Sequence, residues 1–264
     1  MKLIRYEYNG EIYLGELDGQ EVRHIAGDIF NARPATGPAL PLSSVRLLAP
    51  VDPPNIVAIG LNYRSHAGES GEAPPERPLI FIKATTSVIA HGEAIVLPAE
   101  APGAVDYEAE LCVVIGKRAK NVTEEDALEY ALGYMCGDDV SARDCQLKLD
   151  AQWARGKSFD TFCPVGPYIE TEIADPNDLN ICSRVNGAVM QDSNTRNMIF
   201  SVRELISYCS RNMTLLPGTL IMTGTPGGVG FARNPPVYLK EGDVVEVEIE
   251  GLGTLRNLVT AERR

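Results

Sequence analysis

Apolar and polar residues alternate along much of this chain with the two-residue period of β-strands, and helical periodicity is confined to short stretches. Residues 3–25 alternate in this way, interrupted by the turn dipeptides Asn9-Gly10 and Asp18-Gly19. This pattern predicts short antiparallel strands in a small N-terminal β domain. Residues 34–54, rich in proline, alanine and serine, are typical of a surface linker. We therefore divide the chain into residues 1–50 and residues 51–264.

Beyond this boundary, predicted strands outnumber predicted helices. Strands are expected at residues 56–60, 79–83, 111–115, 133–140, 219–223 and 244–249, with a hairpin at 181–190 around Asn186-Gly187. Helices are expected at residues 123–131, at 141–155, and from the capping box of Ser201 and Glu204 to about residue 209. Because the strands do not alternate regularly with long helices, the pattern favours a β-rich α+β fold over a doubly wound parallel sheet.

Acidic residues precede one of the predicted core strands. Glu108 and Glu110 lie just before the apolar run at 111–115, and the alternation of side chains places both on one face. Two carboxylates beside a core repel each other and lose hydration, so they need a cation or must stay partly protonated. A hard divalent metal is the simplest solution. The alternative is a strand whose acids face water, as we expect for Glu246 and Glu248.

The charge and composition of the chain disfavour some binding partners and some cellular locations. The formal charge of −12 and the pI near 4.8 disfavour nucleic acid and anionic membranes. No apolar run is long enough to span a bilayer, and the first residues do not resemble a signal peptide. The six cysteines lack any Cys-x-x-Cys spacing, so we expect reduced and mostly buried thiols in a cytoplasmic protein.

A third acid follows another predicted strand. Asp139 lies where the strand at 133–140 ends, and it would complete a three-carboxylate site with Glu108 and Glu110. An all-oxygen ligand set suits Mg²⁺, Mn²⁺ or Ca²⁺ rather than zinc. The alternative is that Asp139 or Ser141 only caps a helix.

Other segments carry residues typical of an active site. His66 and Glu69 are three apart and can meet on one helical turn, the pairing that activates a water, although a surface contact without a role is the alternative. Lys157 could stabilise negative charge on a substrate oxygen, or it could be an ordinary exposed lysine. The Gly-rich turn at 223–230 is a further candidate segment, although it lacks the Gly-Lys-Ser/Thr of a phosphate loop. Its glycines would let backbone amides and Thr225 approach a carboxylate.

Together these segments resemble one known family. The ordered motifs are Gly-x-Asn-Tyr-x-x-His-Ala-x-Glu from Gly60, Asp-Tyr-Glu-x-Glu-Leu from Asp106, Asp-Asp-Val-Ser-Ala-Arg-Asp-x-Gln from Asp138, Gln-Trp-x-x-Gly-Lys-Ser-Phe-Asp-Thr from Gln152, and Thr-Gly-Thr-Pro-x-Gly-Val-Gly from Thr223. Over residues 55–260 the chain resembles the fumarylacetoacetate hydrolase family. The resemblance implies a mixed β-roll catalytic domain, usually a homodimer, with a divalent ion that is commonly Mg²⁺ or Mn²⁺.

The resemblance also implies roles for single residues. The family's metal carboxylates correspond to Glu108, Glu110 and Asp139, its water-activating pair to His66 and Glu69, and its substrate contacts to Arg143, Gln146, Lys157 and Thr225. Long members of the family add an upstream aspartate to the metal ligands, where this chain has Asn62, which points to the shorter bacterial-type branch. Asp106 has no matching role, so we expect it behind the metal ligands or at the surface.

The implied reaction is hydrolysis of a carbon–carbon bond in an acylpyruvate or similar 2,4-diketo acid. The metal would chelate the 2-oxo carboxylate, His66 held by Glu69 would activate water, and the departing carbon would leave as a metal-bound enolate. Lys157 would stabilise the oxyanion, and Arg143 and Gln146 would hold the acid's oxygens. The alternatives are a decarboxylase of 2-oxo diacids or an isomerase of hydroxymuconate-like dienes at the same site, and, from another class, a metal-binding protein without turnover.

Overall fold

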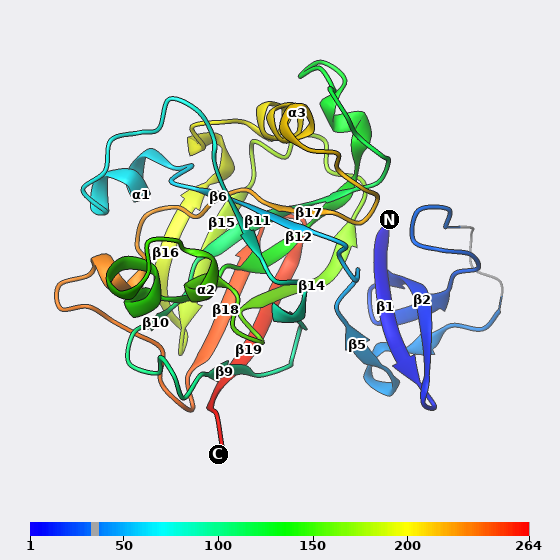
Figure 1. Ribbon diagram of the computed structural model, residues 1–264. Helices are drawn as coiled ribbons and strands as arrows, with labels where there is room; N and C mark the ends of the chain where they lie inside the picture. Colours follow the sequence, from blue (N-terminus) through cyan, green and yellow to red (C-terminus); the bar gives the residue numbers. More distant parts are fainter. Residues whose placement is uncertain (33–36, 264) are drawn as a thin grey trace.

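The computed structural model describes residues 1–32 and 37–263, and it is the β-rich α+β protein that the sequence predicts (Figure 1). Its strands are β1 (Lys2–Tyr8), β2 (Glu11–Asp18), β3 (Glu21–His24), β4 (Leu40–Pro41), β5 (Arg46–Leu48), β6 (Ile56–Gly60), β7 (Leu79–Lys83), β8 (Val88–Ala90), β9 (Ile95–Leu97), β10 (Val105–Asp106), β11 (Ala109–Ile115), β12 (Ala131–Asp138), β13 (Ser141–Ala142), β14 (Cys163–Glu170), β15 (Asn180–Val185), β16 (Ala188–Asn194), β17 (Leu220–Met222), β18 (Val244–Ile249) and β19 (Gly253–Ala261). The α-helices are α1 (Arg64–Glu69), α2 (Ala154–Lys157) and α3 (Val202–Asn212). Short 3₁₀ turns lie at Leu42–Ser44, Thr85–Ser87, Ala127–Tyr130, Thr195–Asn197 and Gly230–Ala232, and a π-helical turn at Cys145–Leu149.

A large mixed sheet forms the centre of the molecule. Its order is β4-β3-β2-β1-β14-β12-β11-β17-β6-β7, with β5 beside β1 and β8 beside β14. A second sheet, β16-β15-β18-β19-β9, and helix α3 pack against it. Every residue of β11 is buried, because apolar clusters cover both of its faces. This strand, which carries the predicted metal ligands at its start, is therefore one of the most firmly held elements of the fold.

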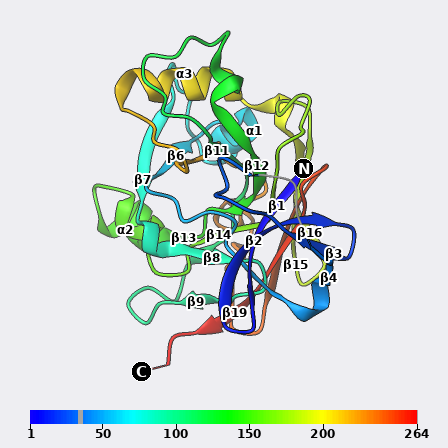
Figure 2. The same cartoon turned by 90° about the vertical axis from the view of Figure 1, so that its right-hand side faces the viewer.

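The N-terminal strands extend the central sheet. β1 and β2 form the predicted antiparallel hairpin, with Asn9 and Gly10 at positive φ in its turn. β1 also pairs with β14, so this unit continues the large sheet at one side of the molecule (Figures 1 and 2). A domain boundary near residue 50 stays a prediction.

The predicted surface linker, in the residues that the structure describes, pairs with the sheet at two short strands and is otherwise irregular apart from one 3₁₀ turn. β4 pairs with β3, and β5 pairs with β1, so backbone hydrogen bonds hold this segment in the sheet. Proline and serine in residues 40–44 form the ends of a strand and a 3₁₀ turn rather than an unpaired connection. The first residues of the predicted linker, up to residue 36, lie outside the described residues.

Other predictions hold where local signals are strong. β6, β7 and β18 have the predicted bounds, β15 and β16 form the predicted hairpin, and α3 begins with the predicted capping box. The predicted helix at 123–131 is only a 3₁₀ turn at Ala127–Tyr130. No helix in the described part of the chain is long and apolar enough to cross a membrane.

The helical character predicted for residues 141–155 is present over 143–149 and from Ala154 onward, but it is not continuous. The first residues of this segment form β13 and pair with β10, and the π-helical turn and α2 follow as separate pieces. The backbone at Gly156 of α2 lies close to this segment, since a Cβ there would lie 2.9 Å from the Ala142 carbonyl oxygen and from the Gln146 nitrogen. α2 thus packs directly on the backbone of the preceding turn, which a continuous helix could not do.

Candidate active site

Sheet register brings three carboxylates together. Glu108 and Glu110 flank the first residue of β11, and Ala109 of β11 lies opposite Asp138 of β12. Asp139 follows directly, and its N–H donates a 2.9 Å hydrogen bond to the Glu108 carbonyl. One oxygen from each of Glu108, Glu110 and Asp139 lies within 4.8 Å of the others, and all three residues are buried. The predicted grouping of these three acids is therefore present.

The second Glu-x-Glu pattern behaves as its alternation predicts. Glu246 and Glu248 lie on β18, where Glu248 is exposed and Glu246 is half-buried. They form ion pairs across the sheet with Arg256 and Arg184. The two patterns look alike in sequence, and the long-range surroundings of their strands make one a buried cluster and the other a solvated face.

Burial and like charge shift the protonation of the cluster. Burial raises the pKa of Glu110 well above its ordinary value, and the neighbouring Asp139 and Glu108 add to this effect. Burial would also raise the pKa of Glu108, but Lys157 and Arg143 outweigh it and hold that pKa below its usual range. Among the described residues no cation forms an ion pair with Glu110, whose hydrogen-bond donor is the neutral Gly224 N–H at 2.8 Å.

Buried lysines compensate the other two acids. Lys157 Nζ donates to Glu108 Oε2 at 2.7 Å and to Asp139 Oδ2 at 2.6 Å. Burial would lower the pKa of Lys157, but Asp139 and Glu108 raise it, so the side chain stays an ammonium. Lys83 of β7 binds the other Asp139 oxygen at 2.5 Å. Lys157 was predicted beside the site, whereas Lys83 was not, because only the order of strands in the sheet brings it there.

Helix α1 holds the predicted base. His66 Nδ1 lies 2.9 Å from Glu69 Oε1, and the His66 side chain is only 8% exposed. Glu69 Oε2 accepts a 2.7 Å hydrogen bond from the Gly228 N–H of the Gly-rich turn. Glu69 thus fixes the imidazole and leaves His66 Nε2 as the ring nitrogen available for chemistry.

Arg143 is the third buried cation beside the carboxylates. Arg143 Nη1 donates to Gln146 Oε1 at 2.8 Å, and Arg143 Nε donates to Asp106 Oδ2 at 2.9 Å. Its Nη2 lies 2.7 Å from Glu108 Oε1 and 2.9 Å from Asp106 Oδ2, so both acids hold the guanidinium, whose five N–H donors leave capacity for a ligand. Asp106 is completely buried behind Arg143, which excludes the surface position that sequence left open.

Thr225, a predicted substrate contact, and Asn62, which replaces the aspartate of long family members, are both engaged within the protein. Thr225 Oγ1 donates to the Ala109 carbonyl at 2.8 Å and accepts from Gln191 at 2.7 Å, so its O–H is not free for a substrate carboxylate. Asn62 donates to the carbonyls of Phe200 and Thr223 and accepts from the Phe200 N–H. Asn62 therefore braces the loops and offers no ligand atom to a metal.

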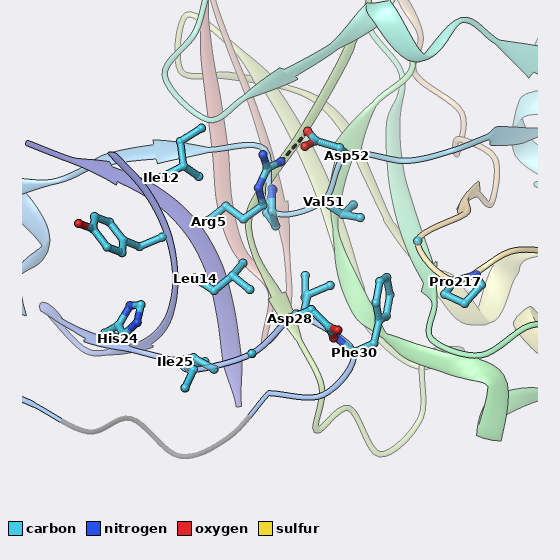
Figure 3. A pocket seen from close by; sticks show the side chains of 16 residues that line it. Arg5, Ile12, Leu14, His24, Ile25, Asp28, Phe30, Val51, Asp52 and Pro217 are labelled. Carbon is cyan, nitrogen blue, oxygen red and sulfur yellow. Dashed lines mark hydrogen bonds and ion pairs between the residues drawn. The ribbon is translucent and has the colours of Figure 1, made fainter. Parts of the chain in front are cut away.

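All predicted site residues except Glu69 line one cavity of about 330 Å³. Its polar lining consists of His66, Ser70, Glu72, Glu108, Glu110, Asp139, Arg143, Gln146, Lys157 and Thr225, and its apolar lining includes Ile59, Leu61, Leu79, Phe81, Leu147, Trp153 and Phe231. Glu69 supports His66 from outside this cavity. A second cavity, of about 510 Å³, lies between the N-terminal strands and the turn at Pro217, and none of the predicted site residues line it (Figure 3).

The three carboxylates suit a hard divalent metal. They offer only oxygen donors, and burial together with the like charges of Asp139 and Glu108 raises the pKa of Glu110. The positive charge of a divalent ion would let all three acids ionise together. The residues present therefore fit a divalent ion of the Mg²⁺ or Mn²⁺ type.

Comparisons with known proteins place the chain among enzymes. Residues 55–260 match the family described as fumarylacetoacetate (FAA) hydrolase C-terminal, and residues 1–50 match Rv2993c-like, N-terminal. Oxaloacetate tautomerase FAHD2A, mitochondrial, of Bos taurus is 49% identical over 226 residues, which cover 84% of this chain and 72% of the relative.

Solved structures of enzymes are similar to this chain over its whole length. 2-Hydroxyhepta-2,4-diene-1,7-dioate isomerase from Mycobacterium marinum has a TM-score of 0.89 at 41% identity, covering 100% of both chains. Fumarylacetoacetate hydrolase from psychrophilic Exiguobacterium antarcticum has a TM-score of 0.86 at 38% identity, covering 99% of this chain and 100% of that chain.

Proposed function

The chain belongs to the fumarylacetoacetate hydrolase family of enzymes, and on that premise we propose that it interconverts the keto and enol forms of a 2-oxo acid, with a dicarboxylic acid such as oxaloacetate as substrate. The observation that carries the proposal is that His66, fixed by Glu69, opens onto the same cavity as the buried carboxylates and Lys157. Enolisation needs a base and a site that stabilises negative charge, and this cavity offers both.

The names of relatives support this reaction class. The Bos taurus relative is named an oxaloacetate tautomerase, and the Mycobacterium marinum structure is that of a diene-dioate isomerase. Both names describe reactions that move a proton next to a 2-oxo or 2-hydroxy acid without adding water. The predicted hydrolysis uses the same residues but needs a water molecule as an additional reactant.

The side chains account for the steps of the reaction. His66 Nε2 takes a proton from the carbon next to the 2-oxo group, and the electron pair of that C–H bond moves into the new carbon–carbon double bond. The carbonyl oxygen becomes negative and is stabilised by the Lys157 ammonium. The proton then returns to that oxygen and gives the enol, so the composition of the substrate is unchanged. Glu69 keeps the imidazole oriented throughout and stabilises its protonated form.

Glu108, Glu110 and Asp139 would hold the metal, proposed to be Mg²⁺ or Mn²⁺. When bound, the ion supplies Lewis-acid stabilisation of the oxygen that becomes negative. Arg143, braced by Asp106 and Gln146, keeps donors directed at the cavity and would bind a carboxylate of the substrate. A homodimer remains part of the proposal, to be tested by light scattering.

Hydrolysis of an acylpyruvate is the second candidate. Its supporting observation is the apolar lining of the cavity, which includes Leu79, Phe81 and Trp153 and would accept an acyl group. The relative from Exiguobacterium antarcticum carries the name of a hydrolase.

One experiment separates the two candidates. Purified protein with Mg²⁺ or Mn²⁺ is mixed with freshly dissolved enol-oxaloacetate, and the decay of enol absorbance is compared with buffer and metal alone. In parallel, acetylpyruvate is offered, and products are identified by mass. Tautomerase activity predicts accelerated enol decay with no change in mass. Cleavage of acetylpyruvate without accelerated enol decay would favour the hydrolase.

A further inference from the structure

Phe231 lies between the base and the substrate anchor. Its ring meets the His66 imidazole edge-on, with centroids 6.4 Å apart at 85°, and the Arg143 guanidinium lies over the same ring at 4.4 Å from its centroid. Phe231 also lines the cavity. No signal in the sequence marked this residue, because it follows the Gly-rich turn and matches no motif that we used.

The position of the ring is fixed by buried hydrogen bonds. Asp106 accepts from the Phe231 N–H at 2.9 Å and from the Gly230 N–H at 2.8 Å, and it also binds Arg143. Gly230 allows this approach, since a Cβ there would lie 2.5 Å from Asp106 Oδ1. The Gly228 N–H holds Glu69. Residues 228–231 thus hold both Glu69, the partner of His66, and Asp106, the partner of Arg143.

Phe231 places an apolar ring beside the His66 imidazole in the cavity wall. The imidazole is 8% exposed, and one of its nitrogens is occupied by Glu69. An attacking water would have to lie within hydrogen-bond reach of Nε2 and would need further polar partners. The phenyl ring of Phe231 offers none on the side that it covers. Removal of a proton from a C–H bond needs no such water.

We propose that Phe231 is a specificity-determining residue that keeps a hydrolytic water away from His66 and so favours proton transfer over carbon–carbon hydrolysis. The proposal rests on the proposed function, because it assigns His66 as the base of an enolising site. It explains how a site with the residues of a hydrolase can act mainly as a tautomerase. Phe231 itself donates and accepts no proton.

The test compares Phe231→Ala with Phe231→Leu. Both substitutions remove the aromatic contact with Arg143, but only alanine opens space beside His66. Each variant is assayed for enol-oxaloacetate conversion and for acetylpyruvate cleavage in water enriched in ¹⁸O, with the label measured in the released acid. Phe231→Ala should raise the ratio of hydrolysis to tautomerisation by about tenfold or more, and Phe231→Leu by less than about threefold. Phe231→Thr repeats the opening if the alanine variant does not fold.

The outcomes are distinct. If the opened variants leave the ratio unchanged or lower both rates in parallel, the proposal for Phe231 is wrong while the tautomerase assignment stands. If the leucine variant shifts the ratio as much as the alanine variant, the contact with Arg143 is responsible and water exclusion is refuted. If the wild-type protein has no tautomerase activity, the proposed function itself fails, and the proposal for Phe231 fails with it.

Discussion

Lys157 Nζ donates a 2.7 Å hydrogen bond to Glu108 Oε2, and the two side chains are only 2% and 5% exposed. The partners come from α2 and from the start of β11, 49 residues apart in sequence. A buried ion pair is costly to form, but removing one partner leaves an uncompensated charge. This pair therefore makes the stability of the metal-free protein sensitive to changes at the proposed site.

Lys157→Met is expected to lower the unfolding free energy of the metal-free protein by roughly 3 kcal/mol, because Glu108 and Asp139 lose their shared ammonium. Urea denaturation in the presence of a chelator measures this loss, and added Mn²⁺ should reduce it. The matched control is Lys148→Met, since the Lys148 side chain is 74% exposed in its pair with Asp144. The control should change stability by less than about 0.5 kcal/mol. Equal losses in the two variants would contradict the account.

Glu110→Gln should weaken metal binding by at least about tenfold, because it replaces a charged ligand with a neutral amide. The metal-free protein should lose no stability, since burial together with Asp139 and Glu108 raises the pKa of Glu110 and favours its neutral form, which the amide resembles. Titration calorimetry with Mn²⁺ measures the affinity. Glu248→Gln is the matched control, as it changes the exposed acid of the second Glu-x-Glu pattern. Unchanged affinity in Glu110→Gln would rule out the ligand set.

His66→Ala should lower the rate of enol conversion by roughly 10²- to 10⁴-fold, the usual contribution of a general base. Glu69→Gln should have a smaller effect, because an amide can still accept from the imidazole but no longer balances its positive charge. Steady-state kinetics measures both, and Mn²⁺ affinity should stay at the wild-type value in both. A His66→Ala variant with the wild-type rate would exclude His66 as the base.

The hydrogen bonds of Glu170 predict a pH effect on stability. Burial would raise the pKa of the Glu170 carboxyl, but hydrogen bonds from the Met1 amino group and the Glu172 N–H lower it. A lowered folded-state pKa stabilises the protein above the unfolded value of about 4.3, and this contribution disappears as pH falls to the folded-state pKa.

Glu170→Gln should therefore cost less than about 1 kcal/mol at neutral pH, because the Met1 partner is partly exposed. The difference from wild type should shrink as pH falls below the unfolded pKa. Thermal unfolding from pH 7 to pH 3 measures the difference, and one that grows on acidification would contradict the assignment.

The local sequence pattern was sufficient to predict some of the contacts in the site. Side-chain alternation placed Glu108 and Glu110 on one face, and helical spacing joined His66 to Glu69. The contribution of Lys83 depends on the sheet order β7-β6-β17-β11, which alternation along one strand cannot reveal. Asp106 was underestimated for a similar reason, since its partners at Gly230 and Phe231 are more than 120 residues away.

The helical character predicted for residues 141–155 is real but interrupted. Ser141 and Ala142 pair with β10 as β13, and α2 packs closely on the preceding turn at Gly156. The result matters for the site, because β13 and the π-helical turn together place Arg143 and Gln146 where a continuous helix would not.

Hydrogen–deuterium exchange at the carbon next to the 2-oxo group tests the central claim most directly. Oxaloacetate is incubated in D₂O with the metal-loaded protein, and its C3 protons are followed by NMR against buffer with metal alone. The account predicts that the wild-type protein accelerates exchange without cleaving a carbon–carbon bond, and that His66→Ala abolishes most of the acceleration. Exchange no faster than in buffer with metal, or equal acceleration by His66→Ala, would contradict it.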